Sequence, residues 1–569
     1  MRARFVFRTR VLCGCFVLAA LLFIVRLYFV QIVHGAGYQN NASAQYIQSD
    51  PDTGSRGSIF FTTKNGELVS AAVMQTGWRI AIKPDEVEDA EAAYAQLSEH
   101  VALDRERFFA SAAKKGDPYE DVVFRVQDDV AKKIRALEIP GLLFVRDQWR
   151  FYPAHELAAQ TIGFVGYQGD KKVGVYGLEK GWQNTLVQTK DGLYLNPFAE
   201  IFTNLQAAVS TNPEAHEGSI VTSLEPSVQR TVEATLAKVV QRYSPKLAGG
   251  IVMDPQTGEI VAMAVRPTFD PNTYNTVADS GVYINPLVES IYEMGSIMKP
   301  LTMAAGIDTG AVSPSTRYND TGCIEKSGKT ICNSDDKAHG VVSMQEVLNQ
   351  SLNTGASFVV DRMGHEVFGQ FVQDLELGKK TGIDLPNEAA GRIQAIENGY
   401  DVDYASASFG QGIAVSPIEM IRALSILANQ GVLPNPHVVT AIKYQSGITR
   451  SVEEKEGRRI LSASSTEAVT RMLVTALDTA LLDGALKEAR YSIAAKTGTA
   501  QIASPGGGYY TNRFLHSFFG YFPAHEPKFI VFLYMVEPQT TDFAAATLAR
   551  PFMDIAKYLI NYYSIPPDR

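Results

Sequence analysis

Cysteine and positive charge are both scarce in this sequence. Only 4 of its 569 residues are cysteine, and no cysteine–histidine cluster has the spacing of zinc ligands. The formal net charge is −9, so no general basic field exists to hold a nucleic-acid backbone. We therefore expect no metal, no cofactor and no nucleic-acid partner.

Long apolar runs are scarce too, with one exception near the N-terminus. A mostly apolar run covers residues 11–33, broken by Arg26, and four arginines precede it. That span is long enough to cross a membrane, and the basic flank predicts a cytoplasmic N-terminus. The alternative is a cleaved signal peptide, which needs small residues after the apolar core, whereas Arg-Leu-Tyr-Phe-Val-Gln follows here. Either interpretation places the bulk of the chain outside the cytoplasm.

The four cysteines divide between the predicted anchor and the exported part. Cys13 and Cys15 fall within the apolar run, whereas Cys323 and Cys332 lie far beyond it. An oxidising compartment would permit a disulfide between the second two. Two free thiols remain an equally open alternative, because the geometry of the pair does not follow from its spacing.

The length and composition indicate a folded protein of several domains. Charged residues make up 20% and the hydrophobic class 46%, which excludes a mostly disordered chain. A chain of 569 residues also exceeds what one core usually supports. We expect a short tail and anchor over residues 1–35, a mixed α/β domain over 36–215, and a second α/β domain over 216–569.

The second domain has a clear pattern of helices and strands. We expect a long helix over 226–243, an apolar antiparallel hairpin over 249–264, and a helical stretch over 341–364 that breaks at 351–355. Three consecutive strands over 491–500, 514–522 and 528–536 predict an antiparallel sheet. An apolar stripe in the last helix, residues 544–563, would pack on that sheet.

The most informative stretch contains Ser296 followed three residues later by Lys299. If a helix begins at Ser296, the two side chains share one face, and an unprotonated Lys299 amine could take the proton of the serine hydroxyl. The spacing alone is weak support, because Ser111–Lys114 and Ser334–Lys337 repeat it. We expect those two copies to be solvated surface positions.

Two further polar motifs follow Ser296 in an order that fits one acyl-transfer site. They are Ser351-x-Asn353, at the predicted break between helices, and Lys496-Thr497-Gly498, in a predicted strand that continues to Thr499. A second Lys-Thr-Gly copy starts at Lys380 but lacks the strand context. Together the three motifs resemble those of the penicillin-recognising serine acyltransferases.

The resemblance extends along nearly the whole chain and narrows to the class B penicillin-binding proteins. The matching elements are Arg26-Leu27-Tyr28, Arg56-Gly57-Ser58-Ile59, Gly177-Leu178-Glu179, residues 253–264, Phe409-Gly410-Gln411-Gly412 and Ser416-Pro417. The resemblance implies a single membrane anchor, a pedestal domain of the dimerisation type, and a C-terminal transpeptidase domain with an antiparallel sheet flanked by helices. It also implies cross-linking of peptidoglycan stem peptides in cell elongation or division, inhibition by β-lactams, and a polytopic glycosyltransferase partner.

Two departures from the family pattern accompany this resemblance. Ile297 follows the nucleophile, where the family often has threonine, and this change barely affects the chemistry. Residues 61–66 replace the aspartate-arginine-asparagine-glycine stretch that commonly follows the Arg-Gly motif. That second departure leaves the details of the pedestal open.

The resemblance also assigns roles to the site residues. Ser296 would attack the penultimate D-alanine with Lys299 as general base, and Ser351 would relay the proton to the leaving amine. The remaining roles belong to five residues: Asn353 would bind a substrate amide and orient Lys299, Lys496 would polarise Ser351, Thr497 and Thr499 would hold the donor carboxylate, and Gly498 would permit close approach. The backbone amides of Ser296 and Thr499 would form the oxyanion hole.

Three other functions use part of the same pattern. A serine β-lactamase shares the Ser296 chemistry but needs only one domain. A β-lactam sensor needs a cytoplasmic output module, and only about ten residues precede the predicted anchor. A non-catalytic scaffold is expected to have lost part of the motif set, which is complete here. We therefore favour the transpeptidase.

Overall fold

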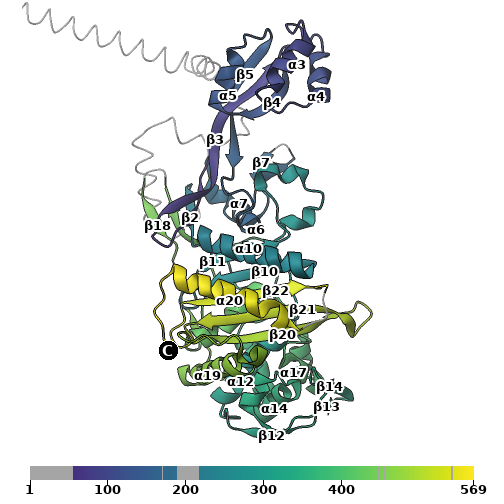
Figure 1. The fold of residues 1–569 in the computed structure, drawn as a ribbon, viewed down its shortest axis with the longest axis vertical. Helices are drawn as coiled ribbons and strands as arrows, with labels where there is room; N and C mark the ends of the chain where they lie inside the picture. Colours follow the sequence, from purple (N-terminus) through teal and green to yellow (C-terminus); the bar gives the residue numbers. More distant parts are fainter. Residues whose placement is uncertain (1–54, 170, 189–216, 445–446, 454, 540–542) are drawn as a thin grey trace, which may run out of the picture. The chain divides into compact units, whose positions relative to one another are not determined.

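The structure is a computed structural model (Figure 1) that describes residues 55–169, 171–188, 217–444, 447–453, 455–539 and 543–569. These residues form two compact units: residues 75–149, and residues 55–74 together with 150–569. None of the helices in these ranges is both long and apolar enough to cross a membrane. The predicted anchor, residues 11–33, lies outside the described residues.

The first unit is a small α/β fold. Its elements are the end of β3 (Leu68–Ile82), α3 (Ala90–Ser98), α4 (Arg105–Ala112), β4 (Glu120–Val126), α5 (Asp128–Arg135) and β5 (Leu142–Phe151). β3 and β4 pair in antiparallel fashion, with Trp78 opposite Val126. Phe108 and Ile134 are buried in its core. The prediction that Ser111 is solvated was wrong, because its hydroxyl is buried and donates to Glu120 Oε2 (3.0 Å).

A five-stranded antiparallel sheet forms the centre of the second unit. Its order is β11-β10-β22-β21-β20, and the strands are β10 (Leu247–Met253), β11 (Ile260–Arg266), β20 (Ala494–Ala503), β21 (Tyr509–Phe522) and β22 (Phe529–Val536). The hairpin and the three consecutive strands expected from the sequence are confirmed. They are joined by the pairing of β10 with β22, which the sequence pattern did not predict.

Helices cover both faces of this sheet, which explains why its central strands are apolar throughout. Along β22, Val531 and Leu533 face one core with α10 (Pro226–Tyr243) and α20 (Ala544–Tyr562). Phe532 and Tyr534 face the other core, which contains α12 (Lys299–Asp308), α18 (Pro417–Ala428) and α19 (Ala463–Thr479). Figure 1 shows α10 and α20 side by side along the sheet. The predicted packing of the last helix on the sheet is confirmed.

Smaller elements complete the second unit. Between α12 and α18 lie β12 (Arg317–Asp320), β13 (Cys323–Lys326), β14 (Lys329–Cys332), β15 (Gly340–Ser343), α13 (Met344–Asn349), α14 (Asn353–Met363), α15 (His365–Asp374), α16 (Gln394–Asn398) and α17 (Asp401–Ala407). The helical prediction over 341–364 was wrong at its start, because β-branched Val341 and Val342 pair with β12 as a strand. The predicted break is confirmed, with Ser351 in the left-handed region at φ 57°.

Residues 55–74 belong to the same compact unit as the large sheet. β2 (Ile59–Thr62) pairs in parallel with β9 (Ser219–Thr222) and in antiparallel fashion with the start of β3. β9 in turn pairs with β17 (Val439–Lys443), followed by β18 (Thr449–Ser451). The other short elements are β1 (Ser55–Arg56), α6 (Ala159–Ile162), β6 (Val165–Gln168), β7 (Lys171–Gly174), α7 (Gly177–Gly181), α8 (Gln183–Leu186), β8 (Val187–Gln188), α11 (Pro286–Glu289), β16 (Val432–Leu433) and β19 (Arg458–Arg459). The predicted domain boundary near residue 216 stays a prediction.

A buried ion-pair cluster joins two sequence motifs that are 123 residues apart. Glu179 is fully buried, and its two carboxylate oxygens accept from Arg56 Nε and Arg150 Nε, each at 2.6 Å. Burial alone would raise the pKa of Glu179, but the two guanidinium groups outweigh it and lower that pKa. Arg56 and Glu179 therefore stabilise the fold, and the Arg-Gly and Gly-Leu-Glu motifs form one structural feature.

We predict that Glu179→Gln lowers the free energy of unfolding by about 3–5 kcal/mol, because it leaves two buried guanidinium groups without their counter-charge. Urea unfolding of the purified protein measures this change. Glu156→Gln, at an exposed carboxylate of the same unit, serves as control and should shift stability by less than about 0.5 kcal/mol. A loss of the same size in both variants would contradict the prediction.

Candidate active site

The segment that carries Ser296 is a tight turn at the start of a buried helix. A 3-10 turn over Gly295–Met298 leads into α12 at Lys299, and Pro300 lies in the first turn of α12, as the sequence predicts. Gly295 has φ 68°, and a Cβ there would lie 2.9 Å from the carbonyl oxygen of Thr499. A side chain at position 295 would thus be strained and would push β20 away from the nucleophile.

Direct hydrogen bonds bring the three polar motifs together. Lys299 Nζ donates to Ser351 Oγ at 3.1 Å and also to the Ser351 carbonyl oxygen. Lys496 Nζ, from the edge strand β20, donates to the same Ser351 Oγ at 3.0 Å. The hydroxyl of Ser351 therefore lies between two amines that come from different elements. Both lysine side chains are buried, with exposed fractions of 1% for Lys299 and 5% for Lys496.

Burial also changes the protonation of these two lysines. Desolvation lowers the pKa of Lys299 well below its usual value, and the charge of Lys496 lowers it further. Desolvation lowers the pKa of Lys496 to about 7. Both causes, burial and the neighbouring ammonium group, shift the pKa of Lys299 in the direction that favours its neutral amine, which is the form that a general base requires.

The other predicted residues lie on the same elements but have partners of their own. Asn353 Nδ2 donates to the carbonyl oxygen of Cys332 (2.9 Å), and Thr499 Oγ1 accepts from the backbone amide of Ala544 (3.1 Å). A Cβ at Gly498 would lie 2.7 Å from the carbonyl oxygen of Met294. Glycine at 498 therefore permits β20 to pack closely on the segment that carries the nucleophile. Thr497 is half-buried on β20, next to Lys496.

We predict that acylation by a penicillin speeds up with pH as Lys299 loses its proton, and levels off well below pH 10.5, the usual lysine value. Lys299→Arg, which stays protonated, should acylate about 100- to 10,000-fold more slowly. Stopped-flow or gel-based labelling at several pH values measures both. Lys380→Arg, at the exposed lysine of the second Lys-Thr-Gly copy, is the control. A Lys299→Arg rate close to wild type would exclude Lys299 as the base.

A hairpin closed by a disulfide supports the Ser-x-Asn motif. The sequence analysis left open whether its two cysteines are joined. Cys323 and Cys332 face each other across β13 and β14 and are joined by a disulfide. Asn333 Oδ1, next to Cys332 in the sequence, accepts from the backbone amide of Thr354 (3.2 Å) and lies 3.1 Å from the hydroxyl oxygen of that residue. Thr354 also donates to Asp320 at 2.6 Å, and Asn333 Nδ2 donates to both oxygens of Asp320 at 3.0 Å.

The sequence analysis missed this buried network because its members belong to no local motif. Asp320, Asn333 and Thr354 are at most 3% exposed. Asp320 ends β12 and Asn333 follows β14, whereas Thr354 lies in the first turn of α14, one residue after Asn353. Two features of the sequence could have indicated it. One is the spacing of the two cysteines, and the other is that Asn333 directly follows Cys332 and Thr354 directly follows Asn353. The network holds the first turn of α14 and thereby the backbone around Ser351 and Asn353.

We predict that Asn333→Ala lowers the free energy of unfolding by about 1–3 kcal/mol, because it removes two hydrogen bonds from Asp320 and leaves the backbone amide of Thr354 without its acceptor. Thermal or urea unfolding measures this effect, and penicillin labelling should also slow as the start of α14 loosens. The control is Asn319→Ala, at an exposed neighbouring position, which should stay within about 0.5 kcal/mol of wild type. Equal effects of the two substitutions would contradict a supporting role of the network.

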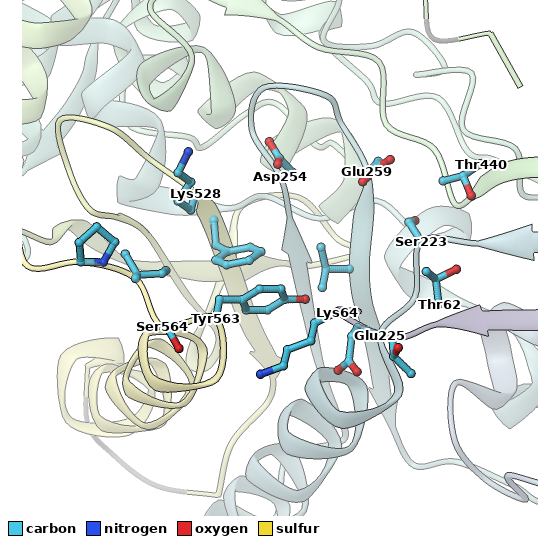
Figure 2. Close-up of a pocket in the computed structure, with 15 residues that line it drawn as sticks. Thr62, Lys64, Ser223, Glu225, Asp254, Glu259, Thr440, Lys528, Tyr563 and Ser564 are labelled. Atoms are coloured by element: carbon cyan, nitrogen blue, oxygen red, sulfur yellow. The ribbon is translucent and has the colours of Figure 1, made fainter. Parts of the chain in front are cut away.

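A separate cavity of about 510 Å³ lies away from this site. Figure 2 shows Glu225, Asp254, Glu259 and Tyr563 around it, with Lys64 and Lys528 at its margin. The cavity lies by β10 and β11, whereas Lys496 lies on β20 at the opposite edge of the sheet. None of the predicted catalytic residues lines this cavity, so it is distinct from the site around Ser351.

Comparison with known proteins places this geometry in a family. Residues 248–554 match the penicillin binding protein transpeptidase domain, and residues 51–195 match the penicillin-binding protein dimerisation domain. The chain belongs to the class B penicillin-binding proteins. Stage V sporulation protein D of Bacillus subtilis is 27% identical to it over 544 residues, which cover 94% of this chain and 82% of that protein. Penicillin-binding protein PbpB of Mycolicibacterium smegmatis is 27% identical in an alignment that covers 99% of this chain and 91% of that protein.

Solved structures of penicillin-binding proteins share the fold of this chain. Penicillin-binding protein 2X from Streptococcus thermophilus gives a TM-score of 0.72 at 20% identity and covers 90% of this chain and 80% of its own. Penicillin-binding protein 3 from Mycobacterium tuberculosis, complexed with aztreonam, gives a TM-score of 0.68 at 23% identity. The match covers 91% of this chain and 98% of that protein's chain. The family expected from the three motifs is therefore confirmed, and so is its two-domain fold.

Proposed function

We propose that this penicillin-binding protein is a serine D,D-transpeptidase that cross-links peptidoglycan stem peptides and is inhibited by β-lactams. The observation that carries the proposal is the Ser351 hydroxyl held between Lys299 and Lys496 beside the turn of Ser296. This arrangement offers a nucleophile, a neutral base and a proton relay in one site. Relatives named peptidoglycan D,D-transpeptidases support the same conclusion.

The first half-reaction forms an acyl-enzyme. The amine of Lys299 takes the hydroxyl proton of Ser296, and the serine oxygen attacks the carbonyl carbon of the penultimate D-alanine. Backbone amides of Ser296 and Thr499 stabilise the oxyanion. The peptide C–N bond then breaks, and the proton passes from Lys299 through Ser351 to the leaving amine of the terminal D-alanine. The hydrogen bond between Lys299 and Ser351 supports this proton path.

The remaining site residues bind the substrate and orient the base. Thr497 and Thr499 hold the donor carboxylate, while Lys496 polarises Ser351 and contributes positive charge. Asn353 binds a substrate amide and helps to orient Lys299. In the second half-reaction an amine of a neighbouring stem peptide attacks the ester carbon and releases Ser296, and attack by water instead gives hydrolysis. A β-lactam would be retained at the ester stage.

We also propose the cellular setting of the reaction. Residues 11–33 would anchor the chain once in the membrane, with the N-terminus in the cytoplasm and the transpeptidase domain outside. The apolar run and its basic flank support this topology. Residues 36–215 would form the pedestal between anchor and transpeptidase domain, and a polytopic glycosyltransferase would be the partner in the membrane.

Labelling with a fluorescent penicillin tests the proposed function. We expect a slowly released adduct that peptide mapping places on Ser296 and that Ser296→Ala abolishes, because this hydroxyl forms the ester. Ser334→Ala, at the exposed serine of a second Ser-x-x-Lys copy, should label like wild type. Labelling that survives Ser296→Ala, or turnover as fast as that of a β-lactamase, would refute the proposal.

A further inference from the structure

The proposed oxyanion hole takes its two donors from segments that are far apart in the chain. Ser296 lies in the turn before α12, and Thr499 lies on β20. Their backbone amides can stabilise one substrate oxygen only if the spacing of the two segments is correct, because catalytic donors must be placed to within a fraction of an ångström. Some contact must therefore hold the turn of Ser296 against β20.

The hydroxyl of Ser517, on β21, contacts both segments. Ser517 Oγ donates to the carbonyl oxygen of Met294, two residues before the nucleophile, at 2.8 Å. It also lies 3.3 Å from the carbonyl oxygen of Gly498, the residue before Thr499. Ser517 has no exposed surface, so water does not compete for these contacts. One buried side chain thus touches the backbone beside each proposed donor.

Glycine at position 498 leaves the space that this hydroxyl occupies. Gly498 and Ser517 lie directly opposite each other in the antiparallel pairing of β20 and β21, so their side-chain positions share one face of the sheet. A Cβ at Gly498 would lie 2.3 Å from Ser517 Oγ and 2.7 Å from the carbonyl oxygen of Met294. The glycine of the Lys-Thr-Gly motif therefore lets Ser517 reach across β20 to the turn.

The glycines permit the two segments to approach closely, but they supply no polar attraction. A Cβ at Gly295 would lie 2.9 Å from the carbonyl oxygen of Thr499, so the turn and the strand are already in contact there. Among the residues that the structure describes, no hydrogen bond joins residues 294–298 directly to residues 496–500. The hydroxyl of Ser517 supplies the polar link between them.

We propose that Ser517 is a positioning residue for acyl transfer. Its hydroxyl holds the turn of Ser296 at the distance from β20 at which both backbone amides reach one oxyanion. This inference rests on the proposed transpeptidase function. Because Ser517 is fully buried, it does not itself contact the substrate. The oxyanion forms only as the serine attacks, so Ser517 should affect the rate of acylation far more than the binding of substrate.

Ser517→Ala tests this role, because it removes the hydroxyl and adds no atoms. Stopped-flow labelling of the full chain with benzylpenicillin separates the dissociation constant of the first complex from the first-order rate of acylation. We expect the rate to fall about 10- to 100-fold, whereas the dissociation constant should stay within about twofold of wild type. If Ser517→Ala does not fold, Ser517→Cys, which keeps a weaker donor, takes its place and should show the same split.

A transition-state analogue gives a second measurement of the same effect. The probe is a donor peptide in which a boronic acid replaces the scissile carbonyl group. Ser296 Oγ adds to the boron as its proton passes to Lys299, and a boron-bound oxygen then takes the place of the oxyanion. We expect Ser517→Ala to weaken the affinity for this probe about 10- to 100-fold.

Ser425→Ala is the matched control for the loss of a buried hydroxyl. Ser425 is also fully buried, and its hydroxyl donates to the carbonyl oxygen of Arg422 at 2.6 Å. Both of these residues lie within α18, so this hydrogen bond does not link the turn of Ser296 to β20. Thermal unfolding should show losses of similar size for the two variants, but only Ser517→Ala should slow acylation.

The outcomes separate this inference from the proposed function. Acylation of Ser517→Ala at the wild-type rate overturns the positioning role. A loss that appears in the dissociation constant instead of the rate overturns it as well, and so does an unchanged affinity for the boronic acid. Equal slowing in Ser425→Ala would also overturn it, because the effect would then come from a general loosening of the core. If neither penicillin nor the boronic acid modifies Ser296 in the wild-type chain, the transpeptidase proposal itself fails.

Discussion

Two lysine amines buried against one serine hydroxyl are the constraint on which this structure depends. Removing an ammonium group from water costs several kcal/mol. The side chains of Lys299 and Lys496 therefore need a rigid, folded environment that holds them near Ser351. Lys299 lies 52 residues and Lys496 145 residues from Ser351 in the sequence. The five-stranded sheet and the helices on its two faces bring these three segments together. The lowered pKa of Lys299 follows from that packing.

Charged groups in this protein fall into two kinds according to whether the fold itself neutralises them. Glu179 is paired with Arg56 and Arg150 and stabilises the structure. Lys299 and Lys496 are instead buried without an ion-pair partner among the described residues, and both donate to Ser351. Uncompensated buried groups at one place are the physical mark of a functional site.

The fold was predictable wherever local pattern and spacing determine it. The helix over 226–243, the hairpin over 249–264 and the three C-terminal strands follow from their apolar periodicity, and the structure confirms each of them. The pattern misled at 341–343, where pairing with β12 makes a strand of residues that were expected to be helical. The solvated interpretation of Ser111 failed for a similar reason, because a partner from β4 buries its hydroxyl.

The sequence by itself determined the family, the order of the three motifs and most of the elements that carry them, because motif spacing and periodicity are local properties. Only the tertiary structure decided which residues surround those motifs. It joined Cys323 to Cys332, and it placed Asn333 and Asp320 against the start of α14. Such contacts connect segments far apart in the chain, and their energies depend on burial and distance, which no local pattern encodes.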